Sequence, residues 1–151
     1  MCRTKRNLGL DEAANWPRRR SSAAEGRRSA LFEGDDGAEA LAVSRVLDEM
    51  DIDTMWCPGP GSGGHAPRCP LVTEGHCELI EKADFVINHL GTHDAGRAAV
   101  ARAVDETPLG DKVAVVAGWQ QADSCRAELR RCAVVDGPLT RRIVEDIAQA
   151  G

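Results

Sequence analysis

Five short runs of mainly apolar residues recur along the chain at roughly even intervals. Each run is three to five residues long and has a charged residue directly beside it on at least one side, which is typical of buried strands. The pattern predicts strands at residues 30–32, 52–56, 85–87, 113–117 and 133–135.

Helical patterns separate these predicted strands. Apolar residues at positions 43, 46, 47 and 50 share one helix face, and Asp36 with Glu39 has the spacing of an N-terminal capping box. A short helix is predicted at 78–82, and an Ala-rich one runs from the capping residue Asp94 to Asp105. Two more are predicted, one with an apolar face at 122, 125 and 129 and one that begins after the cap Thr140.

Strands that alternate with helices predict the fold class. Such an order is typical of an α/β protein with a doubly wound, five-stranded parallel sheet in a three-layer sandwich. In such a sheet, ligands bind at the carboxyl ends of the strands. The loops of interest are therefore residues 34–37, 57–70, 88–94, 118–121 and 136–140.

Length and composition narrow the function classes. A chain of 151 residues has the length of one ordinary domain. Because aromatic residues make up only 3% of the chain and Tyr is absent, we expect an aliphatic core. The scarcity of aromatic residues argues against nucleic-acid binding by base stacking. No run of 18 apolar residues and no apolar leader are present, so we expect a cytoplasmic protein with no membrane partner.

Charge divides the chain into two parts. Residues 1–30 carry eight Lys and Arg but three Asp and Glu, a net charge of +5, whereas the remaining 121 residues carry 11 and 21, a net charge of −10. We therefore expect a basic, flexible N-terminal arm at 1–29 and a folded domain at 30–151. The arm is either a solvated tail or an electrostatic contact for nucleic acid or an acidic partner. The acidic domain itself is not expected to bind nucleic acid.

Four of the predicted strand ends carry notable residues. The acids Asp35 and Asp36 follow the first strand, and His89 ends the third strand in the stretch DFVINHL. Ala117 ends the fourth strand, and Pro138 follows the fifth strand after a Gly. With these positions the folded part resembles a response-regulator receiver domain of the chemotaxis, flavodoxin-like type. That family holds a metal ion at acids after the first strand and has its phosphoacceptor Asp at the place of His89, Thr or Ser at the place of Ala117, and Lys before the Pro. The resemblance therefore implies a degenerate receiver, or pseudo-receiver.

Two residues at this degenerate receiver site have more than one interpretation. His89 is either a phosphoryl acceptor or a hydrogen-bonded structural residue, and the second is the more frequent role of a single His at a strand end. Asp36, with its neighbour Asp35, either caps a helix or holds a metal, and capping is the expectation we favour.

A Cys-, Pro- and Gly-rich loop at 57–77 is unusual for such a fold. Its three thiols and two imidazoles are the ligands that Zn²⁺ prefers, and thiolates also hold iron–sulfur clusters. A fourth ligand could come from Cys125, Cys132 or His89. The alternatives are Cys residues that pack as small apolar groups and a redox disulfide such as Cys69–Cys77. The candidate metal ligands are Cys57, His65, Cys69, His76 and Cys77.

Three functions follow from these patterns. The first is a non-catalytic regulatory module that acts through protein contacts, with an unidentified protein partner or a second copy of the chain. The alternative is a metal- or thiol-redox-sensing module that uses the loop at 57–77. An enzyme is the least expected, because no nucleophile–base pair lies within one motif.

Overall fold

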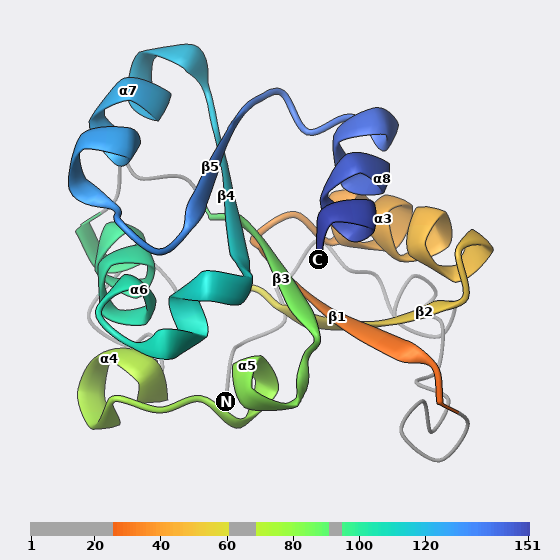
Figure 1. The fold of residues 1–151 in the computed structure, drawn as a ribbon, viewed down its shortest axis with the longest axis horizontal. Coiled ribbons are helices and arrows are strands. Elements are labelled where there is room, and N and C mark those ends of the chain that lie inside the picture. The colour runs from red at the N-terminus through yellow and green to blue at the C-terminus, as the bar shows by residue number, and fades with distance from the viewer. Residues whose placement is uncertain (1–25, 61–68, 91–94) are drawn as a thin grey trace.

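The computed structural model describes residues 26–60, 69–90 and 95–151. At its centre is a five-stranded, all-parallel sheet with the strand order β2-β1-β3-β4-β5, as Figure 1 shows. This arrangement confirms the predicted parallel α/β sheet. The strands are β1 (Arg28–Gly34), β2 (Ile52–Cys57), β3 (Phe85–His89), β4 (Val113–Ala117) and β5 (Ala133–Asp136).

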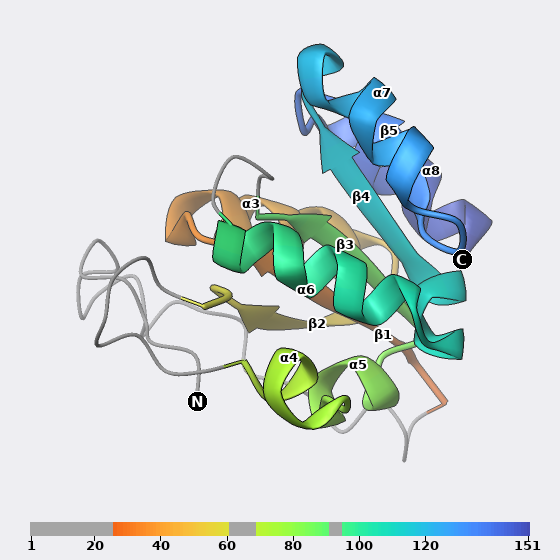
Figure 2. The same cartoon turned by 90° about the vertical axis from the view of Figure 1, so that its left-hand side faces the viewer.

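Helices cover both faces of the sheet and complete the predicted three-layer sandwich. One face carries α3 (Gly37–Glu49) and α8 (Arg141–Ala150), which contact each other. The opposite face carries the other α-helices, whose arrangement Figure 2 shows from the side. These are α4 (Pro70–Glu74), α5 (Glu78–Lys82), α6 (Ala95–Asp105) and α7 (Trp119–Glu128), and the short 3₁₀ helix η1 (Pro108–Lys112) leads into β4. Within the described residues, no helix is long and apolar enough to span a membrane.

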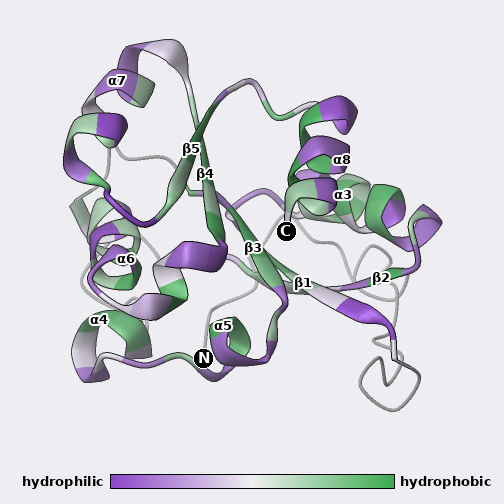
Figure 3. Ribbon diagram, in the orientation of Figure 1, coloured by the Kyte–Doolittle hydropathy of each residue, from purple (hydrophilic) through white to green (hydrophobic). Residues whose placement is uncertain are grey.

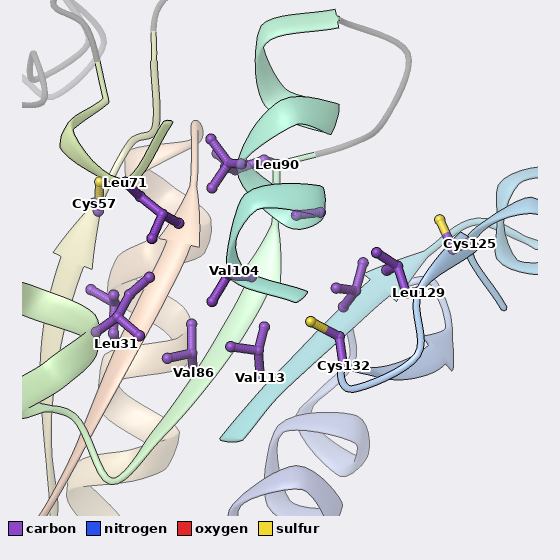
Figure 4. Close-up of a cluster of buried hydrophobic side chains, with 14 of the residues drawn as sticks. Leu31, Cys57, Leu71, Val86, Leu90, Val104, Val113, Cys125, Leu129 and Cys132 are labelled. Carbon is purple, nitrogen blue, oxygen red and sulfur yellow. The ribbon is translucent and has the colours of Figure 1, made fainter. Parts of the chain in front are cut away.

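Two aliphatic cores lie on either side of the sheet. Successive strand residues point to opposite faces, so Leu31 and Val86 pack under α4, α5 and α6, while Phe32 and Ile87 pack under α3 and α8. Figure 3 shows the green, hydrophobic colour along β4 in the middle of the fold, and Figure 4 shows the core under α6 and α7. Burial of these side chains is the main force that holds the layers together.

The first strand begins earlier than the apolar run indicated. Arg28 and Ser29, which the sequence assigns to the basic arm, pair with Ile52 and Asp53 of β2. Arg28 Nη1 donates to the Ala148 carbonyl at 2.8 Å, and its guanidinium lies 5.0 Å from the centroid of the Phe85 ring. The strand therefore begins two residues before the predicted apolar run, because pairing with β2 and the contact of Arg28 with Ala148 hold these residues in the sheet. Residues 1–25 of the predicted arm lie outside the described residues.

The predicted helix caps are confirmed where the structure describes them. Asp36 accepts hydrogen bonds from the amides of Ala38 and Glu39, and Thr140 accepts one from Ile143. Pro70 is the first residue of α4, although the sequence placed it at the end of the preceding loop. At this first position of a helix the missing N–H of proline costs no hydrogen bond. The predicted cap Asp94 lies outside the described residues.

Candidate functional site

The residues of the predicted receiver site gather at the carboxyl ends of the strands. Gly34 pairs with His89 in the sheet register, so Asp35 and Asp36 follow β1 directly beside the end of β3. The Gly137 amide donates to the Ala117 carbonyl at 2.6 Å, which joins the ends of β4 and β5. All these positions therefore lie along one edge of the sheet.

His89 at the end of β3 forms a close pair with a helix residue. Its Nδ1 contacts Oε1 of Glu39 in the first turn of α3, and both side chains are about one-third exposed. Glu39 thus pairs with His89 rather than completing the predicted capping box with Asp36. A phosphoryl group on Nδ1 would have to displace Glu39.

Asp35 forms an ion pair with a cation supplied by the chain itself. Arg97 of α6 places Nη1 2.6 Å from Asp35 Oδ2 and donates from the same nitrogen to the Leu90 carbonyl at 3.4 Å. Arg97 is 9% exposed, so this charge-assisted contact is largely shielded from solvent. The guanidinium therefore links the loop after β1, the end of β3 and α6.

A third polar contact lies deeper under the same edge. Asn88 Nδ2 donates to Glu33 Oε2 at 3.2 Å, and both residues are 3% exposed. Beside them, the indole Nε1 of Trp56 donates to the Gly34 carbonyl at 2.8 Å and fixes β2 against the end of β1. A buried carboxyl group needs such partners, because leaving it unpaired in an apolar interior is costly.

Positions 117 and 137, at the ends of β4 and β5, carry neither a hydroxyl nor an ammonium group. Ala117 is 5% exposed and presents only a methyl group where a receiver would carry a hydroxyl. Pro138 is exposed and follows Gly137 through a cis peptide bond. Glycine at position 137 brings no ammonium group to this end of the site.

The Cys-rich loop shows packing rather than ligand geometry in its described part. Cys57 is buried at the end of β2, and Cys69 and Cys77 are half-buried against the same core, each directly before a short helix. Cys69 and Cys77 are thiols rather than the disulfide that we considered. His76 is exposed, and its Nε2 lies 3.3 Å from Oε2 of Glu74.

Metal binding by this loop stays a prediction. Across residues 26–60, 69–90 and 95–151, no group of three or more His, Cys, Asp or Glu side chains is arranged to hold a metal ion. The remaining candidate ligand, His65, lies outside the described residues.

The two other described cysteines belong to the core. Cys125 and Cys132 are 6% and 7% exposed. Figure 4 shows both among the side chains of the buried hydrophobic cluster. Burial raises the pKa of the Cys132 thiol to about 12, and the nearby carboxylate of Asp105 contributes to the rise. A raised pKa keeps Cys132 in the thiol form at neutral pH, in which it packs as a small apolar group. A fourth metal ligand from Cys125, Cys132 or His89 stays a prediction.

Sequence reasoning missed two members of the site. The sequence places Arg97 only in a helix and gives Glu39 only a role in a helix cap. Their partners, Asp35 and His89, are 62 and 50 residues away along the chain, so no local pattern links them. An Arg in an otherwise Ala-rich segment was the one available signal for Arg97.

Comparisons with known proteins place this geometry in a known fold. No family model and no curated protein matches the chain. Among solved structures, a CheY-like receiver domain from Methylobacillus flagellatus superposes with a TM-score of 0.55 at 16% identity, covering 82% of this chain and 98% of that one. The chain is a receiver-like domain by fold.

Other solved structures agree with this receiver-like domain. A receiver domain from Clostridium thermocellum gives a TM-score of 0.55 at 14% identity and covers 82% of this chain and 93% of that one. A putative pilus assembly protein from Burkholderia thailandensis gives 0.54 at 14% identity, with 82% and 96% covered. The resemblance drawn from the sequence is thus confirmed for the fold.

Proposed function

We propose that this chain is a non-catalytic regulatory module that acts through protein contacts without phosphorylation of an aspartate. The observation that carries the proposal is the ion pair between Asp35 and the buried Arg97. A carboxylate that already has a guanidinium partner is a weak ligand for a metal ion. Release of that partner would leave a cation stranded in a largely buried place.

The other site residues support the same proposal. Phosphoryl transfer needs a nucleophile, a metal ion and further cations around the transferred group. His89 is engaged by Glu39, Ala117 has no hydroxyl group, and Gly137 stands where the receiver family has its lysine. The polar residues of the edge therefore stabilise the ends of β1 and β3, in place of phosphoryl chemistry.

The protein contacts are proposed for the surface formed by α7, β5 and α8. There, β5 is a half-exposed edge strand, and Trp119 at the start of α7 is 82% exposed. Exposed Trp residues are frequent anchors of protein interfaces. Beside β5, a largely apolar cavity of about 260 Å³ is lined by residues that include Val135, Ile143 and Ile147.

Exposure to a small phosphodonor tests the absence of phosphorylation. The full chain is incubated with acetyl phosphate and Mg²⁺, and its intact mass is measured, with a phosphorylatable receiver domain as the positive control. The proposal expects no added phosphoryl group on this chain while the control is modified. A stoichiometric gain that maps to Asp35, Asp36 or His89 would overturn it.

The loop at 57–77 keeps the sensing alternative open for a separate test. Elemental analysis of protein purified without oxygen measures zinc and iron directly. Near-stoichiometric metal, lost on substitution of Cys69 or Cys77 by Ser, would favour a sensing module. A metal-free protein with titratable thiols would favour the contact module.

A further inference from the structure

A cavity lies between the end of α8 and the first residues of β4 and β5. Its volume is about 260 Å³, and most of its lining is apolar. Figure 2 shows the end of α8 beside the start of β4. The apolar lining includes Phe85, Val113, Val135, Ile143 and Ile147. An enclosed apolar cavity of about 150 Å³ binds benzene, so this one has room for a longer apolar group.

The charged residues of the lining differ in how they are paired. The two acidic ones, Asp111 and Asp146, form ion pairs with arginines of this chain, at nitrogen–oxygen distances of 3.4 and 3.9 Å. Lys112 instead donates from Nζ to the backbone carbonyls of Glu81 and Ala83, at 3.3 and 2.7 Å. Among the described side chains that line the cavity, the charge left without an ion pair is therefore positive.

A second cation lies where Phe85 and Gly151 line the cavity. The guanidinium of Arg28 lies 5.0 Å from the centroid of the Phe85 ring, and its Nη1 donates to the Ala148 carbonyl at 2.8 Å. Its other terminal nitrogen, Nη2, is buried and has no hydrogen-bond partner among the described residues. Nη2 lies against Gly151, where an added Cβ atom would be 3.3 Å from it. A buried N–H group without a partner is costly, and an acceptor brought by a ligand would remove that cost.

We propose that this cavity binds a small carboxylic acid with an aliphatic tail, such as a medium-chain fatty acid. The tail would pack against Val135, Ile143 and Ile147, and the carboxylate would accept a hydrogen bond from Nη2 of Arg28 beside Gly151. Ligand sites commonly combine such an apolar lining with a few polar groups that fix the orientation of the ligand. The inference goes beyond the proposed function, because binding requires neither a protein partner nor the carboxyl ends of the strands.

Titration of the full chain with octanoate, followed by NMR of the backbone amides, tests the site. We expect saturable shifts at Val135 and Ile147, with a dissociation constant between about 10 μM and about 1 mM, because a ligand of about ten non-hydrogen atoms has limited affinity. 1-Octanol, which keeps the tail and lacks the charge, should shift the same amides with roughly tenfold lower affinity. Acetate, which keeps only the carboxylate, should give no saturable shift up to about 10 mM.

Arg28→Gln removes the charge at the carboxylate end of the site. This variant should bind octanoate no more tightly than 1-octanol. Unchanged binding of 1-octanol verifies that the variant is folded and that its cavity is intact. The matched control is Arg102→Gln, which makes the same change of charge on α6, on the opposite face of the sheet from α8. That control should keep the preference for octanoate.

Ala133→Leu tests the tail end, because Ala133 lines the cavity and a larger side chain there fills part of it. It should weaken the binding of both ligands at least tenfold, whereas Ala127→Leu, at an exposed position of α7 outside the lining, should change neither.

Three results would overturn the inference. They are octanoate that gives no saturable shift up to about 10 mM, 1-octanol that binds as tightly as octanoate, and an Arg28→Gln variant that keeps the preference for octanoate. Each would leave the proposed function intact, since that function stands or falls on the phosphodonor experiment.

Discussion

Removal of the Asp105 carboxylate at the end of α6 should destabilise the strand that the contact surface depends on. Its oxygens accept hydrogen bonds from three successive backbone amides just before β5. The donors are Arg130 at 2.9 and 3.1 Å, Arg131 at 2.7 Å and Cys132 at 2.9 Å. The carboxylate thus holds the α7–β5 connection against α6.

The expected loss follows from these bonds. A hydrogen bond to a charged group contributes about 1.5–3 kcal/mol, but bonds that share one carboxylate are not additive and this one is partly exposed. We expect Asp105→Ala to lower the free energy of unfolding by about 2–4 kcal/mol, and Asp105→Asn by about half as much, because the amide keeps one acceptor oxygen.

The loss should also depend on pH. Burial alone would raise the pKa of Asp105, but the hydrogen bonds from Arg130, Cys132 and Arg131 outweigh it and hold the pKa below the ordinary 3.8. A lowered folded-state pKa means that the stabilisation is fully present above pH 3.8 and is lost as the pH falls through the folded-state value. The gap between wild type and Asp105→Asn should therefore be constant at neutral pH and should narrow below pH 3.8.

Urea unfolding followed by circular dichroism measures this gap between pH 7 and about pH 3. The matched control is Glu106→Gln, an exposed neighbour on the same helix end, which should change stability by less than about 0.5 kcal/mol. An Asp105→Ala variant as stable as this control would refute the reasoning, and so would a gap that is unchanged at low pH.

Three further outcomes follow from the described contacts. Arg97→Ala and Asp35→Asn should each cost about 3–5 kcal/mol of unfolding free energy, measured by urea titration. The first removes the guanidinium partner of Asp35, and the second leaves the largely buried Arg97 cation without its carboxylate. Arg27→Ala should lower the thermal unfolding temperature, because Arg27 Nη2 lies 3.6 Å from Oδ1 of Asp53, whose side chain is 6% exposed. The double variant with Asp53→Asn should recover part of that temperature loss. Cys132 should resist alkylation by iodoacetamide at pH 8 in the folded protein, because its thiol is buried and has a pKa of about 12. Peptide mass spectrometry measures the rate of modification, and a rate equal to that in urea would contradict this expectation.

The sequence predicts the fold well because fold class depends on local and periodic signals. Buried parallel strands are short apolar runs, and the caps Asp36 and Thr140 act within three residues of themselves. The start of β1 was misplaced because Arg28 and Ser29 look solvent-exposed in sequence. Their partners, Ala148 and Asp84, become neighbours only in the folded chain.

The candidate site is predictable only in part, for the same reason. The strand-end rule locates Asp35 and His89, because it needs only the order of elements. It does not indicate that Arg97 and Glu39 pair with them, since these pairs depend on how α6 and α3 pack over the sheet.

Titration of the protein with Mg²⁺ and beryllofluoride, a phosphoryl analogue, tests the internally neutralised site most directly. The readout is the indole N–H resonance of Trp56, which donates to Gly34 beside Asp35, assigned by comparison with Trp56→Phe. The Trp119 indole on the exposed start of α7 serves as the internal reference. We predict no saturable shift of the Trp56 resonance. A saturable shift that Asp35→Asn abolishes would show that the site binds a metal and a phosphoryl group, and would contradict the proposal.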